Sequence, residues 1–254
     1  MNLDCNWPML KKYFSFFVFL FFSLNIFAQT SNTGTNFWCG FMGNFSGVTE
    51  FRLYFSASDA TMVKIRVPLK NYIDSIFVPK DSVRVFKLTA LLANNQTNNV
   101  ISEFGINIIS DFPITVASMN LQFATTDASI VLPTANIPRN PIYYSVNPNT
   151  GLNSTILLVS PEDSVKIKIT QTKNLAGGQL ANTAFFITLN EAETYQIRIA
   201  NDLSGSKIEV VNNKKLIAFS GDQCSNFPCG ACDHQYEQIL PDEVLDTAYL
   251  VSPH

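Results

Sequence analysis

Three cysteines and a histidine lie close together near the end of the sequence, in the segment CSNFPCGACDHQYEQILP, residues 224–241. The spacing Cys224-x4-Cys229-x2-Cys232, with His234 close behind, provides the ligand types of a small zinc site. Cys229 and Cys232 also have the C-x-x-C spacing of thiol–disulfide oxidoreductases. Structural disulfides are a third interpretation, and the redox state of the compartment decides among the three.

The start of the chain predicts export. Lys11 and Lys12 precede an apolar run from Tyr13 to Ala28, which is shorter than the ~20 apolar residues of a transmembrane helix. A basic patch, a short apolar core and a small final residue are the three parts of a secretory signal peptide. We therefore predict a signal peptide over residues 1–28 and no membrane span after its cleavage. A retained amino-terminal anchor is the alternative.

Signal cleavage removes Cys5 and leaves four cysteines: Cys39, Cys224, Cys229 and Cys232. An even number in an oxidising compartment indicates two disulfides. Such a compartment disfavours zinc, because the thiolates must stay reduced until the metal binds. Redox chemistry is disfavoured because no helix follows the C-x-x-C pair to lower a thiol pKa. We predict no metal site and no cofactor.

The sequence lacks the pattern of a nucleophilic enzyme. His234 is the only histidine away from the carboxy terminus, and Asp233 and Glu237 are close to it in sequence. A G-x-S-x-G nucleophile elbow occurs nowhere in the chain. A loop histidine bonded to backbone is favoured over a catalytic base. We therefore predict no catalytic residue and a protein that is not an enzyme.

Two further groups of residues have both a binding and a structural interpretation. The aromatic side chains of residues 37–41 could hold a sugar or a peptide, but packing into the core is favoured. Asn44, Asn95 and Asn153 begin N-x-S/T sequons, which mark exposed loops where a host glycosylates them.

Composition limits the possible partners. The net charge is −3 at pH 7, and removal of residues 1–28 takes away one acid and two bases, which leaves −4. A mildly acidic chain with scattered lysines and arginines lacks the basic surface that nucleic acid requires. The remaining chain of about 225 residues can hold one large domain or two ordinary domains.

The mature chain has the pattern of an all-β protein. Period-two alternation and enrichment in β-branched and aromatic residues predict strands, and turn-forming residues separate them. The predicted strands are 51–58, 61–69, 82–88, 105–110, 114–120, 154–160, 164–170, 194–199, 206–211 and 216–221. No amphipathic helix of three turns is predicted.

The strand pattern of the second half resembles that of the first. The segment SASDATMVKIRVP around Val63 corresponds to VSPEDSVKIKIT around Val165, an offset of 102 residues. We predict two antiparallel β repeats of about 100 residues, at 29–140 and 141–254. Tandem β-sandwiches are favoured for these repeats, and pairs of β-propeller blades are the alternative.

A series of motifs in fixed order resembles the amino-terminal region of the IgGFc-binding protein family. They are GTNFWCGFMGN (34–44), VLPT (131–134), IYYSV (142–146), ITLNEAETYQI (187–197), NDLSGSKIEV (201–210), LIAFSGDQC (216–224) and CDHQYEQILP (232–241). The resemblance covers nearly the whole mature chain and is most specific from Tyr195 to Pro241. It implies that further repeats follow residue 254 and that this chain holds part of a domain.

The resemblance implies a secreted or cell-surface binding or adhesion protein, not an enzyme, with an extracellular protein or glycan as its partner. A secreted hydrolase acting on glycans and a structural surface-layer protein are the alternatives. No residue that contacts a ligand can be transferred from the family to this chain. The family pattern contains cysteines that match Cys224 and Cys232, which implies that these two pair. Cys39 and Cys229 are additions to the pattern, and we predict that they pair with each other.

Overall fold

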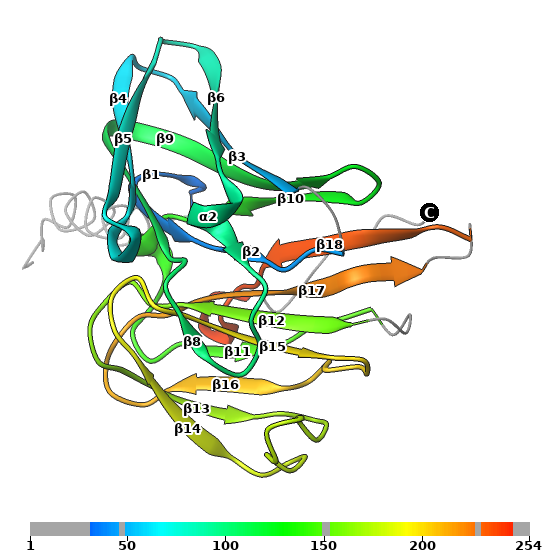
Figure 1. Cartoon of the computed structure of the whole chain (residues 1–254). Coiled ribbons are helices and arrows are strands. Elements are labelled where there is room, and N and C mark those ends of the chain that lie inside the picture. Colours follow the sequence, from blue (N-terminus) through cyan, green and yellow to red (C-terminus); the bar gives the residue numbers. More distant parts are fainter. Residues whose placement is uncertain (1–30, 46–48, 149–152, 227–229, 246–254) are drawn as a thin grey trace, which may run out of the picture. The chain divides into compact units, whose positions relative to one another are not determined.

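The computed structural model describes residues 31–45, 49–148, 153–226 and 230–245 (Figure 1). The chain divides into two compact units, Met1–Ser31 and Asn32–His254, and the described fold belongs to the second. The predicted signal peptide lies outside the described residues. The predicted all-β class is confirmed, because the described part of the second unit consists of antiparallel sheets, one short parallel pair and short helical turns.

The first half forms one sheet, here called the large sheet, with the central order β5-β4-β9-β3-β6. Strands β1 and β10 also pair with the long strand β9. Its members are β1 (Thr33–Cys39), β3 (Thr49–Ala57), β4 (Thr61–Val67), β5 (Tyr72–Val78), β6 (Ser82–Leu88), β9 (Ile106–Gln122) and β10 (Thr126–Val131).

The second half, together with the short strand β8 from the first half, forms two further sheets. The middle sheet has the order β18-β17-β12-β15-β8, and the outer sheet has the order β11-β16-β13-β14. The middle sheet contains β8 (Ile101–Ser102), β12 (Ser154–Val159), β15 (Thr194–Ile199), β17 (Ile217–Asn226) and β18 (Cys232–Gln238). The outer sheet contains β11 (Ile142–Tyr144), β13 (Val165–Thr170), β14 (Phe185–Leu189) and β16 (Lys207–Val210).

The remaining described elements are short. Two strands, β2 (Phe41–Met42) and β7 (Asn94–Asn95), form a small parallel pair. The helical elements are α2 (Ala90–Ala93), η1 (Pro68–Lys70), η2 (Thr134–Asn136) and η3 (Asp242–Val244). Among the described residues, no helix has the length and apolarity needed to cross a bilayer.

Alternation along the strands explains why they form and which face they bury. In β4, the sequence TMVKIRV buries every second side chain and leaves the intervening Met62, Lys64 and Arg66 outside the core. This is the period-two pattern of a half-buried strand rich in β-branched residues. The inward residues of β3 and β9 follow the same rule, so the large sheet buries one face.

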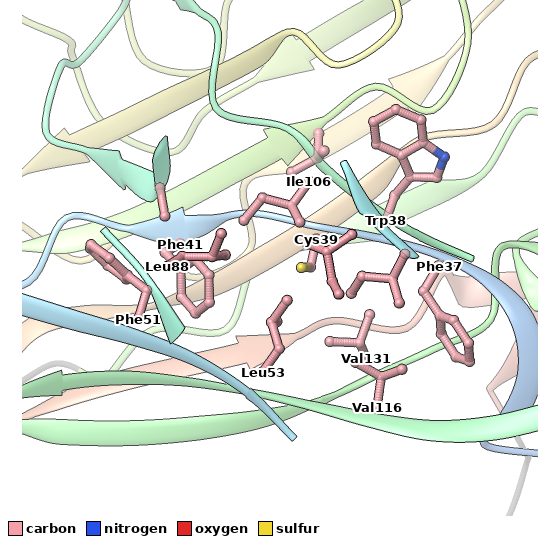
Figure 2. Packing of buried hydrophobic residues seen from close by; sticks show 14 of the residues in the cluster. Phe37, Trp38, Cys39, Phe41, Phe51, Leu53, Leu88, Ile106, Val116 and Val131 are labelled. Atoms are coloured by element: carbon pink, nitrogen blue, oxygen red, sulfur yellow. The ribbon is translucent and has the colours of Figure 1, made fainter. Parts of the chain in front are cut away.

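Two apolar cores lie on the two faces of the middle sheet. The first core joins the large sheet to one face of the middle sheet and includes Leu157, Val159 and Phe219 from the latter (Figure 2 shows part of it). The second core joins the outer sheet to the opposite face and includes Ile156 and Leu158. The middle sheet is therefore shared, and the two halves of the chain do not have separate cores.

The two halves pair their strands in the same order. In the first half β3 lies between β6 and the second part of β9, and β4 lies between β5 and the first part of β9. In the second half β12 lies between β15 and β17, and β13 lies between β14 and β16. One long strand, β9, thus takes the place of two strands, β16 and β17. The shared order supports the internal duplication, which we keep as a proposal.

Candidate functional site

Cys224 lies near the end of β17, and Cys232 and His234 lie at the start of β18, which pairs with β17 in antiparallel fashion. Cys224 and Cys232 are joined by a disulfide, with their Cα atoms 5.1 Å apart. The first predicted pair is therefore confirmed. Its two sulfurs are committed to each other, so they are not thiolates that could bind zinc or react in exchange chemistry.

The predicted bridge between Cys39 and Cys229 is not present. Cys39 is a free thiol and is fully buried in the first core, where Figure 2 shows it among apolar side chains. It lies near the end of β1, where it is paired with Ile106 of β9 and has no access to the surface. Burial raises the pKa of this thiol far above its usual range. Cys229 lies outside the described residues.

His234 is a buried member of a hydrogen-bond network and lies on strand β18, not in a loop as expected. Its Nδ1 is 3.3 Å from the Gln223 carbonyl oxygen, and its Nε2 is 3.2 Å from Asn120 Nδ2. Asn120 Nδ2 also donates to the Met42 carbonyl at 2.7 Å, which fixes the orientation of the amide. Nε2 must therefore accept a hydrogen bond from Asn120 Nδ2, so the imidazole is neutral with its hydrogen on Nδ1.

Burial lowers the pKa of His234 to about 4. The two acidic residues that are close to it in sequence have other surroundings. The Asp233 carboxylate accepts hydrogen bonds from the backbone amides of Thr126 and His234, and Glu237 is exposed. The bond to the Gln223 carbonyl agrees with the expectation that the histidine contacts backbone.

The aromatic residues near the start of the fold pack into the first core, as favoured from the sequence. Phe37, Trp38 and Phe41 are at most 4% exposed. Two of the sequon asparagines also lie inside the protein, since Asn44 and Asn95 are each 1% exposed. The expectation that these sequons mark exposed loops is wrong for this pair, because their amides are used in internal hydrogen bonds.

A row of three polar side chains on β15 attaches the second half to the first. Thr194, Gln196 and Arg198 alternate with the apolar residues of the second core, so they point toward the first half. Thr194 Oγ1 accepts a hydrogen bond from Asn95 Nδ2 at 3.1 Å. The Gln196 side chain accepts from the Gly43 amide at 3.0 Å and donates to the segment that follows β7. The first two members of the row are therefore fully used in structural contacts.

Arg198, the third member of the row, has no such partner. Its Nε and Nη2 atoms are buried without a hydrogen-bond acceptor. Among the described residues, no carboxylate forms an ion pair with it. Burial lowers the pKa of the guanidinium, which nevertheless remains a cation at neutral pH. The guanidinium packs directly over Gly43, where a Cβ would clash with Nη2, so only glycine leaves room for it.

A cavity of about 570 Å³ opens beside Arg198. It forms where β12 begins and β15 ends, because the register pairs Ser154 with both Ile199 and Asp222 and brings their neighbours together. Its lining consists of amide side chains, small apolar residues and the one cation: Asn98, Asn153, Asn174, Ala176, Arg198, Ile199, Ala200, Asn201 and Gln223.

Hydrogen bonds hold part of this lining in place. Asn153 Nδ2 donates to Gln223 Oε1 at 2.8 Å, and Gln223 Nε2 donates to the Asn44 carbonyl at 2.7 Å. Asn98 Oδ1 accepts from Gln196 Nε2 at 2.8 Å. These contacts orient polar groups toward a cavity whose size is within the range of ~300–1,000 Å³ typical of small-ligand sites.

Sequence reasoning missed this cavity. Its residues come from segments around positions 98, 153, 174, 198 and 223, and they share no local spacing. The only sequence signal is that Arg198 follows Thr194 and Gln196 at alternate positions of a predicted strand, which places three polar side chains on one face. The sequence does not show which segment covers that face of the strand. A row of polar side chains that is buried in the fold therefore has the same sequence pattern as a row exposed to solvent.

A family model described as IgGFc binding protein matches residues 127–254. The chain belongs to the IgGFc-binding protein family. The match begins within β10 and includes the outer sheet, β12, β15, β17 and β18. Most residues of the Arg198 cavity, including Asn153, Arg198 and Gln223, therefore lie in the IgGFc-binding region, while Asn98 precedes it. No curated protein and no solved structure gives a significant match to the chain.

Proposed function

We propose that the chain is an extracellular binding or adhesion protein without enzymatic activity, and that it holds a protein or glycan ligand at the Arg198 cavity. The observation that carries this proposal is the composition of the lining. Five amide side chains and one guanidinium can form many hydrogen bonds, whereas the lining residues that the structure describes include no carboxylate, histidine, hydroxyl or thiol. Such a site can recognise a ligand but has no group to transfer a proton or attack a bond.

Membership of the IgGFc-binding family supports a binding role. The amino-terminal sequence supports export, since a basic patch, an apolar run and a small final residue precede the fold. An extracellular location also agrees with the Cys224–Cys232 disulfide, because such bonds persist in oxidising compartments.

The test is a screen of the secreted protein against immobilised glycans and extracellular proteins, with the supernatant analysed for cleavage products by mass spectrometry. We expect reversible retention of a ligand and no released product. Release of shortened glycans or peptides that depends on the purified protein would contradict the proposal and favour the hydrolase alternative.

A further inference from the structure

Resting on the proposed function, we propose that the Arg198 cavity binds a carboxylated sugar, meaning a hydroxyl-rich saccharide that carries one carboxylate, as in uronic or sialic acids. The guanidinium binds the carboxylate, and the surrounding amides form hydrogen bonds with the hydroxyl groups.

The charge of Arg198 is the first argument. A buried cation without a counter-ion is costly in a folded protein, and such groups are normally paired. Arg198 has two buried nitrogens without acceptors, while its third nitrogen, Nη1, is not among these buried atoms. Because Arg198 lines the cavity, Nη1 is the nitrogen that we assign to the ligand. A carboxylate can accept a charge-assisted hydrogen bond from this nitrogen and neutralise the guanidinium.

The rest of the lining is the second argument. Amide side chains carry donors and acceptors, which is the combination that a sugar hydroxyl requires. Internal hydrogen bonds use both groups of Gln223, Nδ2 of Asn153 and Oδ1 of the other three asparagines, so we assign Asn153 Oδ1 and the three remaining Nδ2 groups to the ligand. Ala176, Ile199 and Ala200 add small apolar surfaces for the carbon–hydrogen face of a sugar ring. One cation among five amides suits a ligand with a single charge and many hydroxyls.

An acidic peptide also carries carboxylates but fits the site less well. A peptide with several acidic residues requires several cations, and Arg198 is the only basic residue among the described residues of the lining. The chain as a whole is acidic, with a net charge of −3, and so repels a polyanion. The lining offers no large apolar pocket for a peptide side chain.

The experiment compares two oligosaccharides that differ at one carbon, because one ends in glucuronic acid and the other in glucose. Saturation-transfer NMR and calorimetry measure the binding of each to the secreted protein. A glutamate-containing peptide of similar size is the third probe. We expect the acidic saccharide to bind at least tenfold more tightly than its neutral counterpart, and the peptide to bind no better than the neutral sugar.

Variants then localise the site. Arg198→Gln should reduce affinity for the acidic saccharide at least tenfold, and Arg198→Lys should reduce it by a smaller factor because the charge stays but the fork is lost. Ala176→Trp, at an exposed position of the lining, should block the cavity without touching the core. Arg84→Gln removes the same charge from an exposed position on β6 and is the matched control.

A structural role for Arg198 predicts a different outcome. If the guanidinium only stabilised the fold, Arg198→Gln would lower the melting temperature, whereas removal of an unpaired buried cation should leave it unchanged or raise it. Equal affinity for the two sugars, preference for the peptide, or binding that survives both Arg198→Gln and Ala176→Trp would overturn the inference. The first two results would leave the proposed binding function standing, survival of binding in both variants would move the ligand away from this cavity, and release of cleavage products would remove the binding function altogether.

Discussion

Acidification should destabilise this protein through one residue, His234. Its imidazole is buried and its pKa is about 4 in the folded chain, below the value of 6.5 that applies when it is exposed. Desolvation is the main cause of the lowered pKa, and nearby Arg198 acts in the same direction while Asp233 opposes it. The network around Asn120 also requires a neutral ring, because a proton on Nε2 would face the amide hydrogens of Asn120 Nδ2.

The sign of the effect follows from proton uptake. Between pH 6.5 and about pH 4 the unfolded chain binds a proton at His234 that the folded chain does not bind. The free energy of unfolding must therefore fall as the pH is lowered through this window and stop falling below it. A difference of about 2.5 pKa units corresponds to ~3 kcal/mol, of which ~2 kcal/mol should be lost between pH 7 and pH 5.

The assay is urea unfolding followed by tryptophan fluorescence at a series of pH values, for the natural chain and for His234→Gln. Buried carboxyl groups such as that of Asp222, whose pKa is raised mainly by burial, also make stability depend on pH, but they are common to both proteins and cancel in the difference. The natural chain should lose ~2 kcal/mol more than His234→Gln between pH 7 and pH 5. His254→Gln, which removes the other histidine, should behave like the natural chain. Parallel curves for the natural chain and His234→Gln would refute the reasoning.

Two further predictions concern stability. Replacing both Cys224 and Cys232 with alanine should lower the free energy of unfolding by ~2.5 kcal/mol, because the bond closes a loop across a sequence separation of 8. Urea unfolding with and without reductant measures this effect. If reductant does not change the urea midpoint of the natural chain, the bond does not constrain the unfolded state. Tyr143→Phe removes a buried hydroxyl that donates to the Leu216 carbonyl at 2.5 Å and should cost ~1–2 kcal/mol. Tyr144→Phe, at a side chain 47% exposed, is its control, and equal thermal stability of the two variants would contradict the assigned role of the bond.

Strands with clear alternation were predictable from sequence, and those held by polar contacts were not. The prediction for 82–88 agrees with β6, because its residues are β-branched or aromatic at regular intervals. Strand β18, with the sequence CDHQYEQ, has no β-branched residue and was expected to be a loop. It is held by the disulfide and by side chains of β10. For example, the Asp127 carboxylate accepts a hydrogen bond of 2.8 Å from the backbone amide of Tyr236. Such partners are 109 residues apart and leave no local signal.

Strand β9 was predicted as two strands separated by Pro113. The structure continues it from Ile106 to Gln122 as a single strand. Its pairing with β4 ends at Ser110, and its pairing with β3 begins at Ile114. Proline therefore lies where neither neighbour requires its missing N–H, so the strand tolerates it. The sequence shows the proline, but it does not show that the pairing of β9 with β4 ends before this residue and that the pairing with β3 begins after it.

The sharing of one sheet by two cores has a consequence for how the strands find their alignment. A strand with one solvated face resists a shift of one residue, because the shift turns its apolar side chains to water. Strand β12 lacks this safeguard along its apolar part. A one-residue shift would only exchange Leu157 and Val159 with Ile156 and Leu158 between two equally dry environments.

Alignment of β12 must therefore depend on its polar neighbours. The Asn147 amide donates to the carbonyls of Thr155 and Gly221, which are directly paired across β12 and β17. A shifted strand would present a different pair of carbonyls and leave this buried amide without acceptors. During folding, Asn147 thus distinguishes the correct register of β12 from a register shifted by one residue. The hydrophobic residues, which supply most of the stability, do not distinguish the two registers.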